Sequence, residues 1–294
     1  MTAALHLVPP PVSTGRDPDL VDYLHWAREL KGYAENTVRI RGDVLDRLAE
    51  SVSAPLRHLT EGDLLGWERR AVSGRSPETR RAYVCHVRAF YAWAVDKARI
   101  RDTNPALVLT IPKIPRAVPR PMEEEQLRAA LLGARPKMRV WLLLGAFCGL
   151  RCVEIAGLQW TDLRMSEQPT LHVRGKGGEE RIVPVPAVVL AALDGYGRRR
   201  TGPMFYGLDA QQVSAKTVSH CINRFLSRRG IDATAHQLRH RYATAGYQLT
   251  RDIRLMQEML GHRDPKTTAR YAQYDKSHAA EMVRQLDEQW AAHG

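Results

Sequence analysis

The sequence has no apolar run long enough to cross a lipid bilayer. Its longest apolar stretch extends from Val140 to Leu150, whereas a spanning helix needs roughly 20 consecutive apolar residues. We therefore predict a buried helix there and no membrane span. The N-terminal segment MTAALHLVPPPVSTG lacks a basic stretch before an apolar one and contains three prolines, so it is typical of neither a signal peptide nor a folded element.

Cysteine is scarce in the sequence. The four cysteines, Cys85, Cys148, Cys152 and Cys221, form no CxxC pair, which argues against a disulfide framework and against a cysteine-rich zinc site. Cys148 and Cys152 are expected to share one face of a helix as small buried thiols. A reducing cytoplasm is the simplest setting for such thiols.

Acidic residues are the minority charge. The chain carries 44 Lys and Arg against 32 Asp and Glu, a formal net charge of +12, and its pI is about 9.8. This excess favours a polyanionic partner, either a nucleic acid or an anionic membrane surface. Charge alone does not separate the two.

The length of 294 residues predicts two domains, because a domain usually takes about 100–200 residues. We place a flexible N-terminus at residues 1–16, a helical domain at residues 17–102, a proline-rich basic linker at residues 103–121 and a second domain at residues 122–294. Apolar residues recur at helical spacing throughout the first domain. Cap signals at Thr60–Asp63 and at Ser76–Glu78 mark two helix starts.

Two groups of basic residues in the first half are candidates for contact with DNA phosphates. They are Arg80, Arg81 and Arg88 in the last predicted helix of the first domain, and Lys113, Arg116 and Arg120 in the linker. A solvated surface explains the first group as well as a DNA-facing one does, and an ordinary linker would carry charges like the second. Five prolines between Asp102 and Pro121 are expected to exclude regular structure there.

The second domain is predicted to be mainly helical with a small antiparallel sheet. Helices are expected at Met122–Leu132 and along the apolar run that follows it. Extended segments around Leu171 and Arg181 flank a glycine-rich tip and predict a hairpin. Helices are then expected to the end of the chain, and the last one, from Ser277 to Ala292, has an apolar stripe suited to cover either its own domain or a neighbouring copy.

Several local features are candidates for chemistry, and each has an ordinary structural explanation. Arg151 follows the apolar run and would suit a helix C-terminus, whose dipole favours a cation. Lys176 lies among glycines, but the spacing of a P-loop and its Ser or Thr are missing. Gly261 is typical of a helix C-cap, which makes His262 its exposed neighbour. Tyr271 would ordinarily be a half-buried aromatic residue.

His236 and His240 lie four residues apart on a predicted helix, the spacing of a metal-binding pair. The glutamate of the zinc-protease motif HExxH is missing, because Gln237 stands in its place. No metal is therefore expected.

Taken in order, these features resemble the C-terminal signature of the tyrosine recombinase or phage integrase family. The segment CGLRCVEIAGLQWTDL is similar to the family's first-arginine box, RGKGGEERIVPVP to its lysine hairpin, HQLRHRYAT to its His-x-x-Arg box and LGHRDPKTTARY to its tyrosine box. The resemblance covers most of the chain. It implies an N-terminal all-helical core-binding domain of the SAM-like kind and a mainly α catalytic domain with a small antiparallel β-sheet.

The resemblance also implies roles for three residues. Arg151 and Arg239 are expected to clamp the non-bridging oxygens of the scissile phosphate, and Tyr271 is expected to be the nucleophile. Guanidinium groups suit the charge that spreads over the equatorial oxygens during phosphoryl transfer. Tyr274 is a rival nucleophile, but the sequence spacing from His262 to Tyr271 is the one that the family uses.

The resemblance implies supporting roles for the remaining site residues. His236 and His262 are expected to hydrogen-bond the phosphate and to assist proton transfer, and Lys176 to act as general acid toward the leaving 5′-hydroxyl oxygen. Glu154 is expected to support the arginines, and His240 to pack behind them.

The implied activity is site-specific recombination of DNA through a 3′-phosphotyrosine intermediate, without metal or other cofactor. The implied partners are double-stranded DNA with specific core sites and three further copies of the chain, as a homotetramer on two duplexes, and no membrane partner is implied. An accessory directionality factor is left open. The short segment before Asp17 predicts a simple, Xer-like or minimal integrase without an arm-binding domain. The alternatives are a type IB topoisomerase-like enzyme and a non-catalytic DNA-binding relative.

Overall fold

The computed structural model describes residues 15–114, 120–175, 178–207, 209–262 and 268. The chain divides into two compact units, Met1–Arg116 and Ala117–Gly294. Within the described ranges, every helix is too short or too polar to cross a bilayer.

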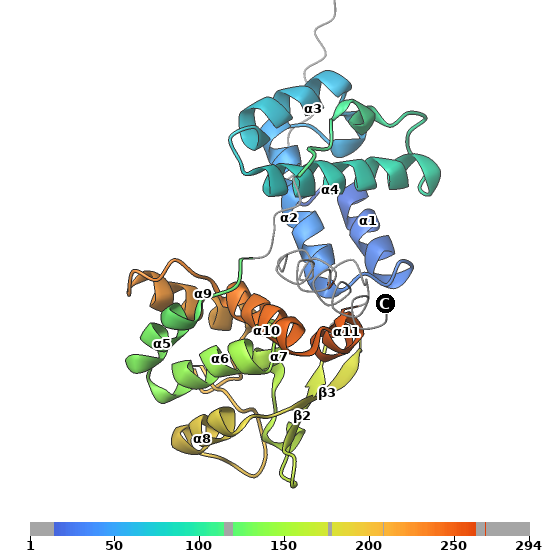
Figure 1. Ribbon diagram of the computed structural model, residues 1–294. Helices are drawn as coiled ribbons and strands as arrows, with labels where there is room; N and C mark the ends of the chain where they lie inside the picture. The colour runs from blue at the N-terminus through green and yellow to red at the C-terminus, as the bar shows by residue number, and fades with distance from the viewer. Residues whose placement is uncertain (1–14, 115–119, 176–177, 208, 263–267, 269–294) are drawn as a thin grey trace, which may run out of the picture. The chain divides into compact units, whose positions relative to one another are not determined.

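The regular structure described in the first unit is helical (Figure 1). Its elements are α1 Pro18–Glu29, α2 Glu35–Val52, η1 Leu56–His58, α3 Glu61–Trp67, the π-helical turn η2 Glu68–Val72, α4 Pro77–Asp96 and η3 Pro105–Val108. The predicted caps start two of these helices. Thr60 and Asp63 form a reciprocal capping box at α3, and the Ser76 side chain accepts from the backbone of Thr79 at the start of α4.

The segment predicted as a linker begins inside the core of the first unit. Ala106 and Leu109 are fully buried there among the apolar residues of the helices. Asn104 caps η3 by accepting from the backbone N–H of Ala106 at 2.9 Å. The expectation that the prolines exclude regular structure was wrong at η3, because Pro105 suits the first position of a short helical turn.

The second unit combines helices with one small sheet. Its elements are α5 Glu124–Leu132, α6 Pro136–Phe147, α7 Cys152–Gly157, η4 Trp160–Asp162, β1 Leu163–Arg164, β2 Thr170–Arg174, β3 Glu180–Pro184, α8 Ala187–Tyr196, α9 Ala215–Ser227, α10 Ala235–Thr250 and α11 Ile253–Leu260. The strands are antiparallel in the order β1-β2-β3. The prediction of a mostly helical fold with a small antiparallel sheet is confirmed.

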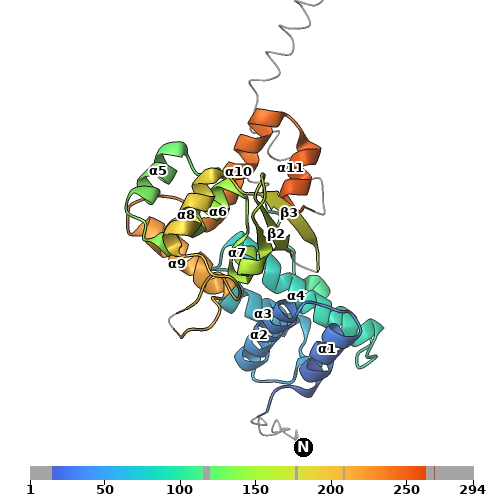
Figure 2. The same ribbon diagram turned by 90° about the horizontal axis from the view of Figure 1, so that it is seen from below.

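Helix α6 is the central element of the second unit. It is buried along most of its length, and it packs against both α8 and α10 (Figure 2). The predicted buried helix is therefore present, but it ends at Phe147 rather than at Leu150. Cys148 closes α6 and Cys152 starts α7, so the expectation that these two cysteines share a helix face was wrong.

Candidate active site

Two glycines allow Arg151 and Arg239 to approach each other. Gly149 turns the chain between α6 and α7 with φ +64°, and an added Cβ there would lie 2.4 Å from the ring of Tyr242. Gly145 lets α10 lie close to α6, since an added Cβ would lie 3.0 Å from a leucine of α10. Arg151 consequently lies at the N-terminus of α7, and not at a helix C-terminus as its position after the apolar run suggested. Arg239 lies on the buried side of α10, 2% exposed.

The carbonyl oxygen of Leu260 shows that the two guanidinium groups converge. Arg239 Nη2 donates to it at 2.5 Å, and Arg151 Nη1 donates to it at 3.4 Å. Arg151 Nη2 also donates to the carbonyl of Gly261 at 3.2 Å, and Arg239 Nη1 to that of Gly149 at 2.6 Å. Two permanent charges are therefore within hydrogen-bonding reach of a single oxygen atom, an arrangement that is suited to binding an anion.

Glu154 lies behind the arginines, with its side chain fully buried. Its carboxylate accepts from the backbone N–H and from Nη1 of Arg151, both at 2.8 Å. Arg239 Nη1 lies 3.6 Å from it. The predicted supporting residue is thus in contact with both arginines that the sequence singled out.

The surroundings of Glu154 keep it ionised. Burial alone would raise the pKa of this carboxyl group. Hydrogen bonds from Arg181 and its charge, the backbone N–H of Arg151 and the charge of Arg239 outweigh burial and hold the pKa at about 2. The carboxylate is therefore a fixed negative charge against which the guanidinium groups are oriented.

His262 follows directly after Gly261, the left-handed C-cap of α11 with φ +61°. Its Nδ1 is 2.9 Å from Oγ1 of the buried Thr268, and Gln257 Nε2 donates to its carbonyl at 3.0 Å. Burial, reinforced by the charges of the neighbouring arginines, lowers the pKa of His262 to about 3. The imidazole is therefore neutral near pH 7 and can donate one hydrogen bond while accepting another.

His236 and His240 lie in the first turns of α10, with their ring centroids 4.3 Å apart. His236 is exposed and His240 is half-buried. His236 precedes Arg239 by three residues, which places them on neighbouring positions of one helix face. Among the described residues, no group of three or more His, Cys, Asp or Glu side chains is placed to hold a metal.

Four residues that the sequence singled out lie outside the described residues: Arg116, Lys176, Tyr271 and Tyr274. The structure does describe β2 and β3 on either side of the hairpin tip that carries Lys176, where the backbone N–H of Gly175 donates to the carbonyl of Glu179 at 2.6 Å. It also describes α11 and His262, which lead toward Tyr271.

The candidate DNA-binding residues differ in exposure. Arg81, Lys113 and Arg120 are exposed. Arg80 is half-buried, 3.6 Å from a glutamate of η2. Arg88 is half-buried and donates to a backbone carbonyl after η3 at 3.4 Å.

Arg181 on β3 is a member of the cluster that sequence analysis missed. Its Nη1 and Nη2 donate to the two carboxylate oxygens of Glu154 at 2.9 and 2.8 Å, and its Nε donates to the carbonyl of Met259 at 2.9 Å. The sequence placed Arg181 in a strand, where an alternating polar residue is ordinarily a solvated one. The structure instead places it between Glu154 of α7 and the end of α11, which packs against β3.

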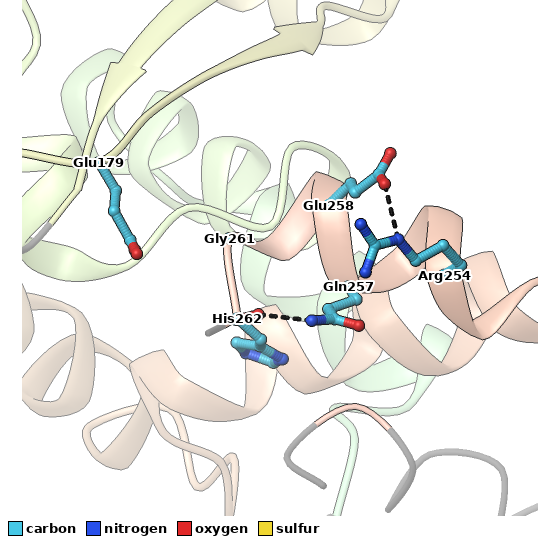
Figure 3. A pocket seen from close by; sticks show the side chains of 6 residues that line it. All are labelled: Glu179, Arg254, Gln257, Glu258, Gly261 and His262. Atoms are coloured by element: carbon cyan, nitrogen blue, oxygen red, sulfur yellow. Dashed lines mark hydrogen bonds and ion pairs between the residues drawn. The ribbon is translucent and has the colours of Figure 1, made fainter. Parts of the chain in front are cut away.

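A hollow of about 260 Å³ lies beside His262 (Figure 3). It is lined by Glu179, Arg254, Gln257, Glu258, Gly261 and His262. Arg254 Nε donates to Glu258 at 2.9 Å on its α11 wall, and Glu179 enters from the hairpin side in Figure 3. The hollow therefore opens between the lysine hairpin and the helix that leads to the tyrosine box.

Comparison with known proteins points to one family. The profile of the Phage integrase family matches residues 120–278. Tyrosine recombinase XerA of Pyrococcus furiosus is 30% identical over 276 residues, 88% of this chain and 91% of that protein. Tyrosine recombinase XerC of Xanthomonas campestris pv. campestris is 33% identical over 248 residues, 80% of this chain and 74% of that protein.

Solved structures share the fold at lower sequence identity. A lambda integrase dimer bound to a COC′ core site matches with a TM-score of 0.69 at 18% identity, covering 86% of this chain and 75% of that one. XerH bound to palindromic difH substrate in a post-cleavage complex matches with a TM-score of 0.65 at 19% identity, covering 91% and 84%. The chain belongs to the phage integrase family and is a tyrosine-type site-specific DNA recombinase.

Proposed function

We propose that Arg151 and Arg239 hold the scissile phosphate of DNA while Tyr271 attacks it. The convergence of both guanidinium groups on the carbonyl oxygen of Leu260 is the observation that carries this proposal. A phosphate group bound beside the Leu260 carbonyl would face two permanent charges oriented by Glu154. Such preorganised charge is what stabilises the oxygens of a transferring phosphoryl group.

The reaction balances without a cofactor. The hydroxyl group of Tyr271 passes its proton to His236 and its oxygen forms a bond to phosphorus. The bond from phosphorus to the 5′ oxygen of the next nucleotide breaks, and Lys176 gives that oxygen a proton. The 3′-phosphotyrosine keeps the energy of the broken bond, so a 5′-hydroxyl from another strand can reverse the step. A phenol with an ordinary pKa near 10 is a poor nucleophile, and nearby cations favour its phenolate character as the bond forms.

The histidines are proposed to complete the phosphate site. His262 is neutral near pH 7 because its pKa is about 3, so its Nε2 is suited to donate a hydrogen bond to a phosphate oxygen. His236 precedes Arg239 by one turn of α10 and is exposed, so it is accessible to DNA. His240 supports this turn from behind.

We propose that residues 17–102 form the core DNA-binding domain and residues 122–294 the catalytic domain. Residues 103–121, whose first part packs into the core of the first unit, are proposed to be the basic linker between them. Exposed Arg81, Lys113 and Arg120 are suited to contact phosphates. The net charge of +12 supports DNA as the partner, in the cytoplasm where bacterial and phage DNA is found.

A lambda integrase neighbour is described as a tetramer bound to a Holliday junction, which supports a tetramer on two duplexes.

A covalent adduct tests the proposed nucleophile. The protein is mixed with nicked suicide DNA carrying candidate core sites, and the SDS-resistant protein–DNA adduct is quantified. Wild-type protein should form the adduct and Tyr271→Phe should not, because only the phenolic oxygen can form the bond.

Tyr274→Phe is the matched control, because it removes the same hydroxyl three residues away and should leave the adduct in place. An adduct that survives in Tyr271→Phe and disappears in Tyr274→Phe would move the nucleophile to Tyr274. If wild-type protein binds the DNA and forms no adduct, the catalytic proposal is wrong for this chain.

A further inference from the structure

A single side chain, Arg181, connects the buried carboxylate of the site to the end of α11. Its two terminal nitrogens donate to the two oxygens of Glu154 at 2.9 and 2.8 Å, and its Nε donates to the carbonyl of Met259 at 2.9 Å. The side chain is 10% exposed. A planar guanidinium group with three directed donors used in this way fixes its acceptors in one plane.

The groups that Arg181 contacts also orient Arg151 and Arg239, the residues proposed to bind the phosphate. The same Glu154 carboxylate receives the backbone N–H and Nη1 of Arg151, both at 2.8 Å. The carbonyl after that of Met259 belongs to Leu260, on which Arg151 and Arg239 converge. Arg181 therefore contacts both Glu154 and the end of α11, the two parts of the structure that hold Arg151 and Arg239 in place. It is not itself one of the two arginines that converge on Leu260.

Close packing at the end of α11 supports the same conclusion. Gly261 lies against Arg181, since an added Cβ would be 3.2 Å from its Nη1 and 3.4 Å from its Cδ. His262 is the next residue, so the backbone that presents the imidazole rests on this arginine. A displacement of Arg181 would therefore move His262 and the carbonyl groups of Met259 and Leu260.

We propose that Arg181 is a positioning residue for the strand-cleavage step: it holds the Glu154 carboxylate and the C-terminal end of α11 in register, and thereby aims Arg151, Arg239 and His262 at the scissile phosphate. This inference rests on the proposed function of those residues. Arg181 acts through them and does not itself touch the reacting atoms.

Three variants test the proposal with nicked suicide DNA: Arg181→Lys, Arg181→Ala and Arg198→Lys. Lysine keeps the charge of Arg181 but cannot reach both Glu154 oxygens and the Met259 carbonyl at once. Arg198→Lys is the matched control in the same unit, because Arg198 also donates to both oxygens of one carboxylate, that of Asp194, at the surface. The measurements are the DNA dissociation constant, the rate of adduct formation at saturating DNA and the melting temperature.

We expect Arg181→Lys to slow adduct formation by about 100-fold, since small misplacements of reacting groups cost about that much. Its dissociation constant should change less than about threefold, because the converging arginines and the net charge remain. Arg198→Lys should match wild type in both the rate of adduct formation and the dissociation constant. Methylguanidinium, at concentrations that leave the melting temperature unchanged, should restore part of the rate of Arg181→Ala and none of the rate of Tyr271→Phe, because it can replace the missing donors.

The contrary outcomes are distinct from one another. A wild-type adduct rate in Arg181→Lys would overturn the inference and leave the proposed function standing. A loss confined to DNA affinity, with the normal rate at saturating DNA, would make Arg181 a DNA-contacting residue instead. A loss explained entirely by the unfolded fraction, without rescue by methylguanidinium, would reduce its role to stability. If wild type forms no adduct, the proposed function fails, and the inference fails with it.

Discussion

Arg151 lies at the positive end of a helix, where a cation is electrostatically unfavourable. Glu154 compensates by accepting from its backbone and its side chain. Arg181 and Arg239 face the same carboxylate, so among the described contacts three guanidinium groups share the single negative charge of Glu154. A phosphate bound at this cluster, as proposed, would add negative charge beside these guanidinium groups and stabilise them.

The lowered pKa of His262 predicts a pH dependence of stability. In the unfolded chain its pKa returns to the ordinary value of 6.5, whereas in the fold it is about 3. Between these values the unfolded state binds the proton and the folded state does not, so the free energy of unfolding rises with pH through this window and falls as the solution is acidified. Urea unfolding at pH 7 and pH 5 should therefore show a loss of stability at pH 5.

The variant His262→Gln isolates this contribution, because glutamine keeps a hydrogen-bonding side chain that does not titrate. Its stability should fall less between pH 7 and pH 5 than that of wild type. His25→Gln, in the first unit, is the control and should reproduce the wild-type pH dependence of the second unit. If the free energy of unfolding fell equally for wild type and His262→Gln between pH 7 and pH 5, the lowered pKa of His262 would not be the cause of the pH dependence.

At the scale of elements, the turn between α6 and α7 decides where Arg151 lies. Gly149 occupies it with φ +64°, and an added Cβ would lie 2.4 Å from the ring of Tyr242. Gly149→Ala should lower the free energy of unfolding by about 2 kcal/mol or more, since a left-handed residue costs about 1–2 kcal/mol and overpacking about 1–3 kcal/mol. Urea denaturation measures the change.

The matched control for Gly149→Ala is Gly195→Ala in α8. An added Cβ at Gly195 meets no atom within 4 Å, and alanine favours a helix by up to about 1 kcal/mol, so this variant should be as stable as wild type or more so. Equal stability of Gly149→Ala and wild type would show that the turn relaxes freely.

The rate of adduct formation by Gly149→Ala should also fall, because Arg151 directly follows the turn.

Elements with a local signal were predictable from the sequence. The alternation around Leu171 and Arg181 predicted the β2–β3 hairpin, and Gly261 predicted the end of α11. The break between α6 and α7 was missed, because Cys148 and Leu150 are buried and a turn inside a buried run looks like continuous helix. Likewise, η3 was missed because the burial of Ala106 depends on distant helices.

The candidate site was predictable only in part, for the same physical reason. Arg151, Glu154, Arg239 and His262 were found from ordered motifs, and the structure brings them together. Arg181 was missed because its role depends on contacts with Glu154, 27 residues earlier, and with Met259, 78 residues later. No spacing along the chain encodes such contacts.

At the scale of the whole molecule, the net charge of +12 predicts a steep salt dependence of DNA binding. Each phosphate neutralised by Lys or Arg releases counterions, so affinity falls with salt. For about six to ten phosphate contacts, the affinity should fall by about 10³- to 10⁵-fold between about 50 and 200 mM salt. Arg81→Gln, which removes an exposed charge of α4, should lower the slope of log K against log salt by about one.

Fluorescence anisotropy with labelled core-site DNA measures these slopes, and Arg128→Gln on α5 supplies the control. Arg128 is exposed and pairs with Glu124 one turn away, so its removal changes the net charge equally without removing one of the proposed phosphate contacts. Its slope should equal that of wild type. Equal slopes for Arg81→Gln and wild type would place Arg81 on a solvated surface. An affinity that stays flat over this salt range would contradict binding through phosphates altogether, because the release of counterions follows from any such contact.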